Sequence, residues 1–328
     1  MNYSIAELQQ QFSCALEADR ERISEFKPHG LYEPVDYTLD MGGKRLRPVL
    51  VLLGCALFSD DVEKAIPAAL AVEVFHNFTL LHDDIMDKAE MRRGRPCVHL
   101  KYNDNTAILS GDAMSVMAFE HLSNLDPSIL TPALKLFSRT ALEICEGQQY
   151  DMEFENRDDV SVAEYLEMIR LKTAVLLACS LKIGAMAGNA PSNDLESIYR
   201  AGIDLGLAFQ LQDDFLDVYG DPKTFGKRIG GDIISNKKTF MLLSALEASK
   251  TNNDDRLAKW LAKEAFPEEE KIEAVKRIYN EYGIDELARN KMLAYHERFL
   301  KLVETLDISE SGKSILVSLG GKLTRRNR

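Results

Sequence analysis

Apolar residues recur along most of this chain at a spacing close to 3.6 residues, and this periodicity constrains the fold more than any other feature. It runs through long segments rich in Ala, Leu, Glu and Lys, such as 128–155 and 283–304. Alternating runs of Val, Ile and Thr, which would indicate strands, are absent from the sequence. We therefore predict an all-α protein.

The periodicity predicts about twelve helices, separated by breaks that carry Gly and Pro. They are expected at 4–24, 44–58, 62–88, 97–121, 128–155, 161–187, 192–219, 238–249, 254–265, 268–281, 283–304 and 309–323. No break is long enough to be a domain linker, and no internal repeat is present. We expect residues 1–328 to form a single domain, a large helical bundle.

Charge and cysteine content exclude several classes of protein. The net charge of -12 disfavours broad binding to nucleic acid, which requires an electropositive face. The longest apolar run, 49–58, is too short to span a bilayer, and the first residues lack the features of a signal peptide. The 5 cysteines include no C-x-x-C pair, so a disulfide framework is not indicated. We expect a cytoplasmic protein that is not integral to a membrane.

Two related acidic motifs stand about 130 residues apart: LHDDIMD at 81–87 and LQDDFLD at 211–217. On a helix the first and last aspartates of each motif share a face, with the middle one about 100° away. Each motif ends a segment that holds a single formal charge, Glu73 in 66–82 and Asp204 in 201–212. Acids clustered at the ends of buried helices repel one another unless cations neutralise them.

Carboxylate oxygens select Mg²⁺ or Mn²⁺, and Mg²⁺ completes its shell with water and substrate phosphates. A polyphosphate substrate would also need basic side chains and backbone N–H donors. The sequence supplies both near chain breaks, in clusters that each resemble ordinary surface when taken alone. These clusters are GGKRLRP at 42–48, RRGRP at 92–96, Lys172-Thr173, GKR at 226–228, KKT at 237–239 and RRNR at 325–328.

In order and spacing, these motifs resemble the trans-prenyltransferases, the polyprenyl diphosphate synthases. The resemblance runs from Gly42 to Thr239, includes FQLQDDFLD at 209–217, and extends to the basic C-terminus. It implies the all-α isoprenoid synthase fold, with a central cavity between the helices that bear the two motifs. It also implies a homodimer that condenses isopentenyl diphosphate head-to-tail with an allylic diphosphate.

The resemblance further assigns roles to individual residues. Three Mg²⁺ ions, or Mn²⁺ in their place, would be held directly by Asp83, Asp87 and Asp213, assisted by Asp84, Asp214 and Asp217. The allylic diphosphate would meet Arg92, Lys172, Lys237 and Lys227, with Arg228 as the alternative to Lys227. Isopentenyl diphosphate would meet Lys44, Arg47, His76 and Arg93, with a terminal arginine such as Arg325 as a further contact. Thr173 and Gln210 would direct their dipoles at the carbocation.

Product length in this family depends on residues four or five positions before the first motif, here Thr79 and Phe78, with Phe75 one turn deeper. One aromatic and one small residue favour the C20 product, with C15 as the close alternative. On an ideal wheel, however, Phe78 lies about 140° from Asp83, so it closes the pocket only if the helix is kinked or its ring reaches round.

Other interpretations are weaker. A class I terpene cyclase needs no second diphosphate pocket, head-to-head synthases use D-x-x-x-D, and a regulatory subunit would not need both acidic motifs intact. Glu73 and His76 also spell E-x-x-H, a di-iron ligand pattern, but the chain holds no second copy of it.

Overall fold

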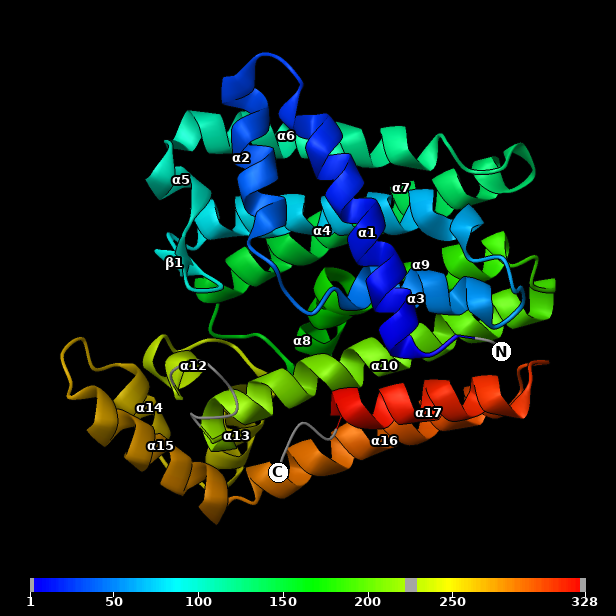
Figure 1. Cartoon of the computed structure of the whole chain (residues 1–328). Coiled ribbons are helices and arrows are strands. Elements are labelled where there is room, and N and C mark those ends of the chain that lie inside the picture. The colour runs from blue at the N-terminus through cyan, green and yellow to red at the C-terminus, as the bar shows by residue number, and fades with distance from the viewer. Residues whose placement is uncertain (1–2, 222–228, 325–328) are drawn as a thin grey trace. The chain divides into compact units, whose positions relative to one another are not determined.

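The computed structural model describes residues 3–221 and 229–324, and nearly all of their regular structure is helical. Within these ranges the only strands are β1 (Met91–Arg92) and β2 (Arg95–Pro96), a two-stranded antiparallel hairpin. The all-α prediction is confirmed (Figure 1). None of the helices in these ranges is long and apolar enough to cross a membrane.

The chain divides into two compact units, and the first comprises Met1–Ser138, Cys179–Tyr199 and Asp307–Ile315. Its complete elements are α1 (Ile5–Ser24), α2 (His29–Asp40), α3 (Leu46–Ala56), η1 (Glu63–Ala65), α4 (Ile66–Met86), α5 (Val98–Lys101), α6 (Asp104–Leu122) and the hairpin. Helix α4 packs against both α3 and α6, as Figure 1 shows. A helix covered on several sides must be apolar all round, which explains why α4 carries so few charges.

The second unit comprises Arg139–Ala178, Arg200–Leu306 and Leu316–Arg328. Its complete elements are α8 (Val162–Ile169), the π-helical turn η2 (Arg170–Ala174), α12 (Gly231–Ile234), α13 (Phe240–Thr251), α14 (Arg256–Leu261), α15 (Glu268–Glu281) and α16 (Ile284–Glu304). Four helices have residues in both units: α7 (Pro127–Glu155), α9 (Val175–Ala187), α10 (Ser192–Tyr219) and α17 (Glu310–Thr324). The core of this unit is rich in aromatics, including Tyr165, Phe215 and Tyr279.

Local chemistry fixes the start of α8. Ser161 accepts a hydrogen bond from the backbone N–H of Glu164 at 3.2 Å, while the Glu164 carboxylate accepts from the N–H of Ser161 at 2.9 Å. This reciprocal cap satisfies two N–H groups that a helix start otherwise leaves without partners. It thereby defines where the helix that leads into Lys172 begins.

Several expected boundaries were wrong. Helix α2 was not predicted, because Pro34 and Gly30 in its sequence indicate a break. The expected helix 97–121 is two helices, α5 and α6, and 161–187 is interrupted by η2. The basic cluster 92–96, expected at a chain break, belongs to the hairpin 91–96. The single domain stays a prediction.

Candidate active site

The first acidic motif ends helix α4, and its middle aspartate faces inward. Asp84 is buried and accepts from the Arg92 guanidinium, with Nε at 2.7 Å and Nη2 at 2.6 Å from Oδ1. Asp83 is half-buried, with Oδ2 3.9 Å from Arg92 Nη2, and Asp87 is exposed. Asp87 forms the helix C-cap, where its N–H donates to the carbonyl of Asp83 at 2.8 Å. The motif therefore presents its outer carboxylates and holds the middle one inside.

The hairpin that supplies Arg92 turns at Arg93 and Gly94. Both have positive φ, 52° and 76°, which is the backbone of a type I′ two-residue turn. The register pairs Arg92 with Arg95 across this turn. Arg92 ends β1 and Arg93 begins the turn with a left-handed backbone, so the two consecutive arginines can contact different partners.

Arg93 lies against the glycine pair at 42–43. Its Nη1 donates to the carbonyl of Gly42 and lies 3.5 Å from Asn77 Oδ1. A Cβ on Gly43, whose φ is +121°, would stand only 2.7 Å from Cζ of Arg93. The glycine thus gives the guanidinium room to approach the backbone.

A cluster of arginine side chains lies around His76 on α4. Nη1 of Arg47 lies 3.0 Å from Nε2 of His76. Burial, followed by the charges of Arg47, Arg93, Arg92 and Arg45, holds the pKa of His76 well below its usual range. Burial and the neighbouring Arg45 also lower the pKa of Arg93. A bound anion would be stabilised by these crowded guanidiniums, which repel one another beside a neutral imidazole.

Arg45 was missed by sequence reasoning. It has a left-handed backbone, with φ 47°, and its guanidinium donates to the buried carboxylate of Glu73 and to the carbonyl of Leu39. Glu73 Oε1 also accepts from Nδ2 of Asn77 at 2.8 Å. The signal was present, since the one charge in a buried helix requires a buried counter-charge. These contacts give Glu73 a structural partner and argue against the di-iron interpretation of Glu73 and His76.

The second acidic motif also buries its middle carboxylate, with different partners. Asp214 accepts from the phenol of Tyr165 and, at 3.1 Å, from Nε2 of Gln210. Thr173 Oγ1 in turn lies 3.1 Å from Gln210 Oε1. Burial and the nearby carboxylate of Asp232 raise the pKa of Asp214 to about 7. Thr173 and Gln210, predicted to face a carbocation, thus belong to the network that holds Asp214.

The outer aspartates of the second motif, Asp213 and Asp217, are half-buried. Asp217 Oδ2 accepts from the N–H of Asp232 at 3.0 Å, and its carbonyl accepts from the N–H of Gly230 at 2.6 Å. The segment 230–237, which includes Gly230 and Asp232, ends at the exposed Lys237. The N–H of Lys237 donates to the carbonyl of Asp232 at 2.9 Å. The structure therefore connects Lys237 to the second motif through a short chain of hydrogen bonds.

Lys172 lies in the π-helical turn η2 and pairs with an aspartate that sequence reasoning missed. Nζ of Lys172 is 2.6 Å from Oδ2 of Asp151 on α7. A Cβ on Gly147 would stand 2.4 Å from the backbone N of Lys172, so the glycine permits the close crossing of these two segments. π-Helical turns are frequent at functional sites. The anionic partner that a lysine in an apolar helix requires is Asp151.

The predicted chain-length residues lie on two faces of α4. Thr79 Oγ1 donates to the carbonyl of His76 at 2.8 Å, on the face that carries Asp83. The Phe78 ring contacts those of Phe75 and His82, with centroids 5.3 and 4.8 Å away. Phe75 continues to Phe137 of α7 at 5.1 Å. Phe78 is therefore part of an aromatic wall beside the acidic face, in line with the ideal helical wheel.

The acidic residues fit a hard divalent cation. In both motifs the middle carboxylate is held by the protein. Of the outer aspartates, Asp87 is exposed, and Asp83, Asp213 and Asp217 are half-buried. Within the described ranges, no group of three or more Asp, Glu, His or Cys side chains is placed to hold a metal ion. Mg²⁺ binds through one or two carboxylates and fills its shell with water and phosphate, so the oxygen ligands of the outer aspartates fit it. Lys227, Arg228 and Arg325 lie outside the described residues, so their predicted roles stay predictions.

Comparison with known proteins identifies the family. The polyprenyl synthetase family matches residues 28–281. A geranylgeranyl pyrophosphate synthase of Geoglobus acetivorans is 40% identical over 309 residues, 94% of each chain. A solved geranylgeranyl pyrophosphate synthase is 45% identical with a TM-score of 0.94, over 99% of this chain and 100% of that one.

A geranylgeranyl pyrophosphate synthase from Corynebacterium glutamicum, solved with isoprenyl diphosphate and magnesium, is 26% identical with a TM-score of 0.84, over 98% of each chain. The resemblance drawn from the motifs is confirmed. This chain is a prenyltransferase of the polyprenyl synthetase family.

Proposed function

We propose that the chain condenses isopentenyl diphosphate head-to-tail with allylic diphosphates, in the presence of Mg²⁺, and releases mainly the C20 product. The observation that carries the proposal is the combination of two acidic motifs, whose outer aspartates are exposed or half-buried, and a cluster of arginines around His76. The acidic motifs suit a metal-bound diphosphate, and the arginines around His76 suit an anion bound by side chains alone. A reaction between two diphosphates needs both.

In this proposal the outer aspartates and Lys172, Lys237 and Arg92 receive the allylic diphosphate. When bound, Mg²⁺ would supply Lewis-acid stabilisation of the negative charge that develops on the leaving diphosphate. Arg92 and the lysines add charge-assisted hydrogen bonds that strengthen as the allylic C–O bond breaks. The groups that hold Asp84 and Asp214 keep each motif in a fixed geometry.

Lys44, Arg47, Arg93 and His76 hold isopentenyl diphosphate so that its terminal double bond attacks the allylic cation. A neutral His76 offers a hydrogen bond without adding a titrating charge. The new carbon–carbon bond leaves a tertiary cation, and loss of one proton forms the product double bond. The departing diphosphate is the proposed base, since the reaction places it beside that proton.

Three observations support C20 as the main product. Phe75 and Phe78 lie about one to two turns before the first motif, and Phe137 of α7 continues their aromatic wall, at a distance from the motif that suits a short chain. Thr79, a small residue, stands on the acidic face of α4 at the same level. The relatives with the most extensive similarity described above are named geranylgeranyl pyrophosphate synthases. C15 is the alternative.

The test incubates the purified chain with labelled isopentenyl diphosphate and each of three primers, C5, C10 or C15, with Mg²⁺, with Mn²⁺ or with EDTA. Chromatography of the dephosphorylated alcohols should show C20 from every primer and no product in EDTA. Cyclic hydrocarbon from an allylic substrate alone would indicate a terpene cyclase. Absence of product under all conditions would indicate a regulatory subunit.

We also propose a homodimer through the outer face of α6. Ile108, Leu109 and Val116 are exposed there, while other parts of α6 pack on α2 and α4. An apolar face of this kind is costly to leave in water and suits a second copy of the chain. Analytical ultracentrifugation should show a dimer that Leu109→Glu with Val116→Glu converts to a monomer. A monomeric wild type would contradict this proposal.

A reducing compartment, the cytoplasm, is the proposed location. All five cysteines are free thiols in the structure, and Cys55, Cys97 and Cys179 are buried. Burial raises the pKa of Cys55 to about 11, which keeps that thiol protonated and unreactive.

A further inference from the structure

Lys271 of α15 is a buried ammonium with unusual partners. Its side chain is fully buried, at 0% exposure. Nζ donates to Asn236 Oδ1 at 2.7 Å and to the carbonyl of Ile234 at 3.1 Å, and lies 4.1 Å from the centroid of the Phe266 ring. Among the described residues no carboxylate pairs with it. A buried charge that meets only neutral dipoles is costly, and both of its hydrogen bonds go to one segment, 230–237.

This segment closes on the second acidic motif. At its start, Gly230 and Asp232 donate backbone hydrogen bonds to Asp217, at 2.6 and 3.0 Å. At its end stands Lys237, which the proposed function assigns to the allylic diphosphate. Between them, α12 is a single helical turn, far too short to be stable alone. The position of the segment therefore depends on what holds its other side.

Two further contacts show that α14 and α15 provide that support. Asn236 has a left-handed backbone, φ 56°, and its Nδ2 donates to the carbonyl of Leu261 at the end of α14, at 3.1 Å. Gly230 packs so closely on α15 that an added Cβ would lie 2.6 Å from Ile272 Cδ1. The segment is thus held from one side by Asp217 and from the other by Lys271, Leu261 and Ile272.

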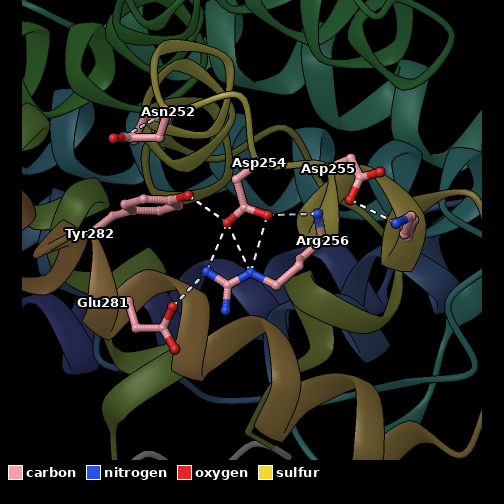
Figure 2. A network of polar contacts seen from close by, with 8 residues as sticks. Asn252, Asp254, Asp255, Arg256, Glu281 and Tyr282 are labelled. Atoms are coloured by element: carbon pink, nitrogen blue, oxygen red, sulfur yellow. Dashed lines mark hydrogen bonds and ion pairs between the residues drawn. The ribbon is translucent and has the colours of Figure 1, made fainter.

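A polar network fixes α14 against α15, as Figure 2 shows. Arg256, at the start of α14, places Nη2 2.7 Å from Asp254 Oδ2 and 2.6 Å from Glu281 Oε2. The hydroxyl of Tyr282 donates to the same Asp254 oxygen at 2.6 Å. The network joins the first turn of α14 to the last turn of α15. The two helices that hold Asn236 are therefore themselves tied together.

We infer that Lys271 is a positioning residue of the allylic diphosphate site, which acts through Asn236 and Ile234 to hold Asp217 and Lys237 in place. It touches no reacting atom. The inference rests on the proposed function for its kinetic consequence, but the anchoring of segment 230–237 is measurable without catalysis.

The kinetic test compares Lys271→Met, which keeps the length of the stem and removes the ammonium, with Lys259→Met, which removes an exposed ion pair of α14. Lys271→Met should raise KM for the allylic diphosphate about tenfold and leave KM for isopentenyl diphosphate within about twofold. Lys259→Met should change neither. Equal changes in both KM values, or none, would overturn the inference.

Asn236→Gly provides a second variant, because glycine adopts the positive φ at this position without strain. Like Lys271→Met, it should raise KM for the allylic diphosphate and leave KM for isopentenyl diphosphate nearly unchanged. Val303→Ala, at a buried position of α16, is the control for lost stability. It should lower Tm without altering the ratio of the two KM values, and an altered ratio would reduce Lys271 to an ordinary stabilising residue.

Hydrogen exchange of the full chain separates this inference from the proposed function. In Lys271→Met the amides of 230–237 should exchange at least about tenfold faster, while those of α16 keep their wild-type rates. Unchanged exchange in 230–237 would overturn the anchoring role even if the kinetics changed. A wild type without prenyltransferase activity would refute the proposed function, and the exchange result would still decide the anchoring.

Discussion

The two acidic motifs have one sequence pattern but hold their middle carboxylates in opposite ways. Asp84 is paired with the guanidinium of Arg92. Asp214 instead accepts from neutral donors, Tyr165 and Gln210, and its pKa is raised to about 7 by burial and by Asp232. The first motif is thus compensated by a charge of the chain itself, whereas the second is supported by dipoles.

This difference predicts which charged groups each motif depends on. A carboxylate held by an arginine keeps its geometry whether or not a cation is present. A buried carboxylate held by dipoles beside another carboxylate gains far more from added positive charge. We therefore expect the second motif to depend more strongly on Lys237 and on metal, and the first to depend on Arg92.

The largest effect should follow removal of an outer carboxylate from either motif. Asp83→Ala and Asp213→Ala should each lower kcat by at least ~10³, because both remove interactions made mainly in the transition state. Steady-state kinetics, with circular dichroism to confirm folding, measures this. Asp255→Ala, an exposed acid beside α14, is the control and should be silent. A mild effect of either variant would contradict the assignment of that motif to metal binding.

The next largest effect distinguishes the group that holds Asp84 from the groups that hold Asp214. Arg92→Gln should lower kcat/KM by ~10²–10³, since it removes a substrate contact and leaves Asp84 buried without its counter-charge. Tyr165→Phe removes one hydrogen bond from Asp214 and should cost about tenfold. The comparison fails if Tyr165→Phe proves the more harmful change.

The two anion pockets should separate in KM. Lys44→Ala or Arg93→Ala should chiefly raise KM for isopentenyl diphosphate, and Lys237→Ala should raise KM for the allylic substrate. Each lost charge-assisted contact is worth roughly 1.5–3 kcal/mol. Measuring both KM values for all three variants is sufficient. An effect of Lys44→Ala on the allylic substrate alone would reverse the assignment.

Product length provides a test within the first unit. Phe78→Ala should lengthen the main product by at least one isoprene unit, because it removes a ring from the aromatic wall while metal dependence is unchanged. Phe75→Ala is the companion variant, and it should also destabilise the fold by about 3–5 kcal/mol, since Phe75 is buried. Chromatography of the alcohols reports the lengths. An unaltered product from Phe78→Ala would assign the floor to Phe75 or Phe137.

The smallest effect concerns pH. Because the pKa of His76 lies well below its usual range, the imidazole is neutral throughout the working range and loses no charge as pH rises. His76→Gln should therefore raise KM for isopentenyl diphosphate by the same factor at every pH from about 6.5 to about 8.5. The ratio to wild type cancels titration of the substrate. A ratio that falls towards one as pH rises would show that His76 binds as a cation.

Local patterns were sufficient for the helical class, both acidic motifs and the basic clusters. Helix α2 was not predicted because Gly30 and Pro34 indicate a break. Pro34 nevertheless lies inside this helix, where it removes one backbone donor. The turn η2 has no marker in the sequence either, because it arises where a helix adapts to its packing.

The residues that hold the site residues in place were not predicted, for another reason. Arg45, Asp151 and Tyr165 each act on a partner far along the chain, at separations of 28, 21 and 49 residues. A single charge in an apolar helix, such as Glu73 or Lys172, predicts that a group of opposite charge lies nearby. Which residue supplies it depends on how helices pack, and no local pattern records that.

The central claim is that the two acidic motifs hold the allylic diphosphate through divalent cations. Calorimetric titration with an allylic thiolodiphosphate, whose C–S bond resists ionisation, tests it most directly. Binding should be tight with Mg²⁺ and at least about a hundredfold weaker in EDTA, and Asp83→Ala and Asp213→Ala should each weaken the Mg²⁺-dependent binding. Equal affinity with Mg²⁺ and with EDTA would contradict the claim.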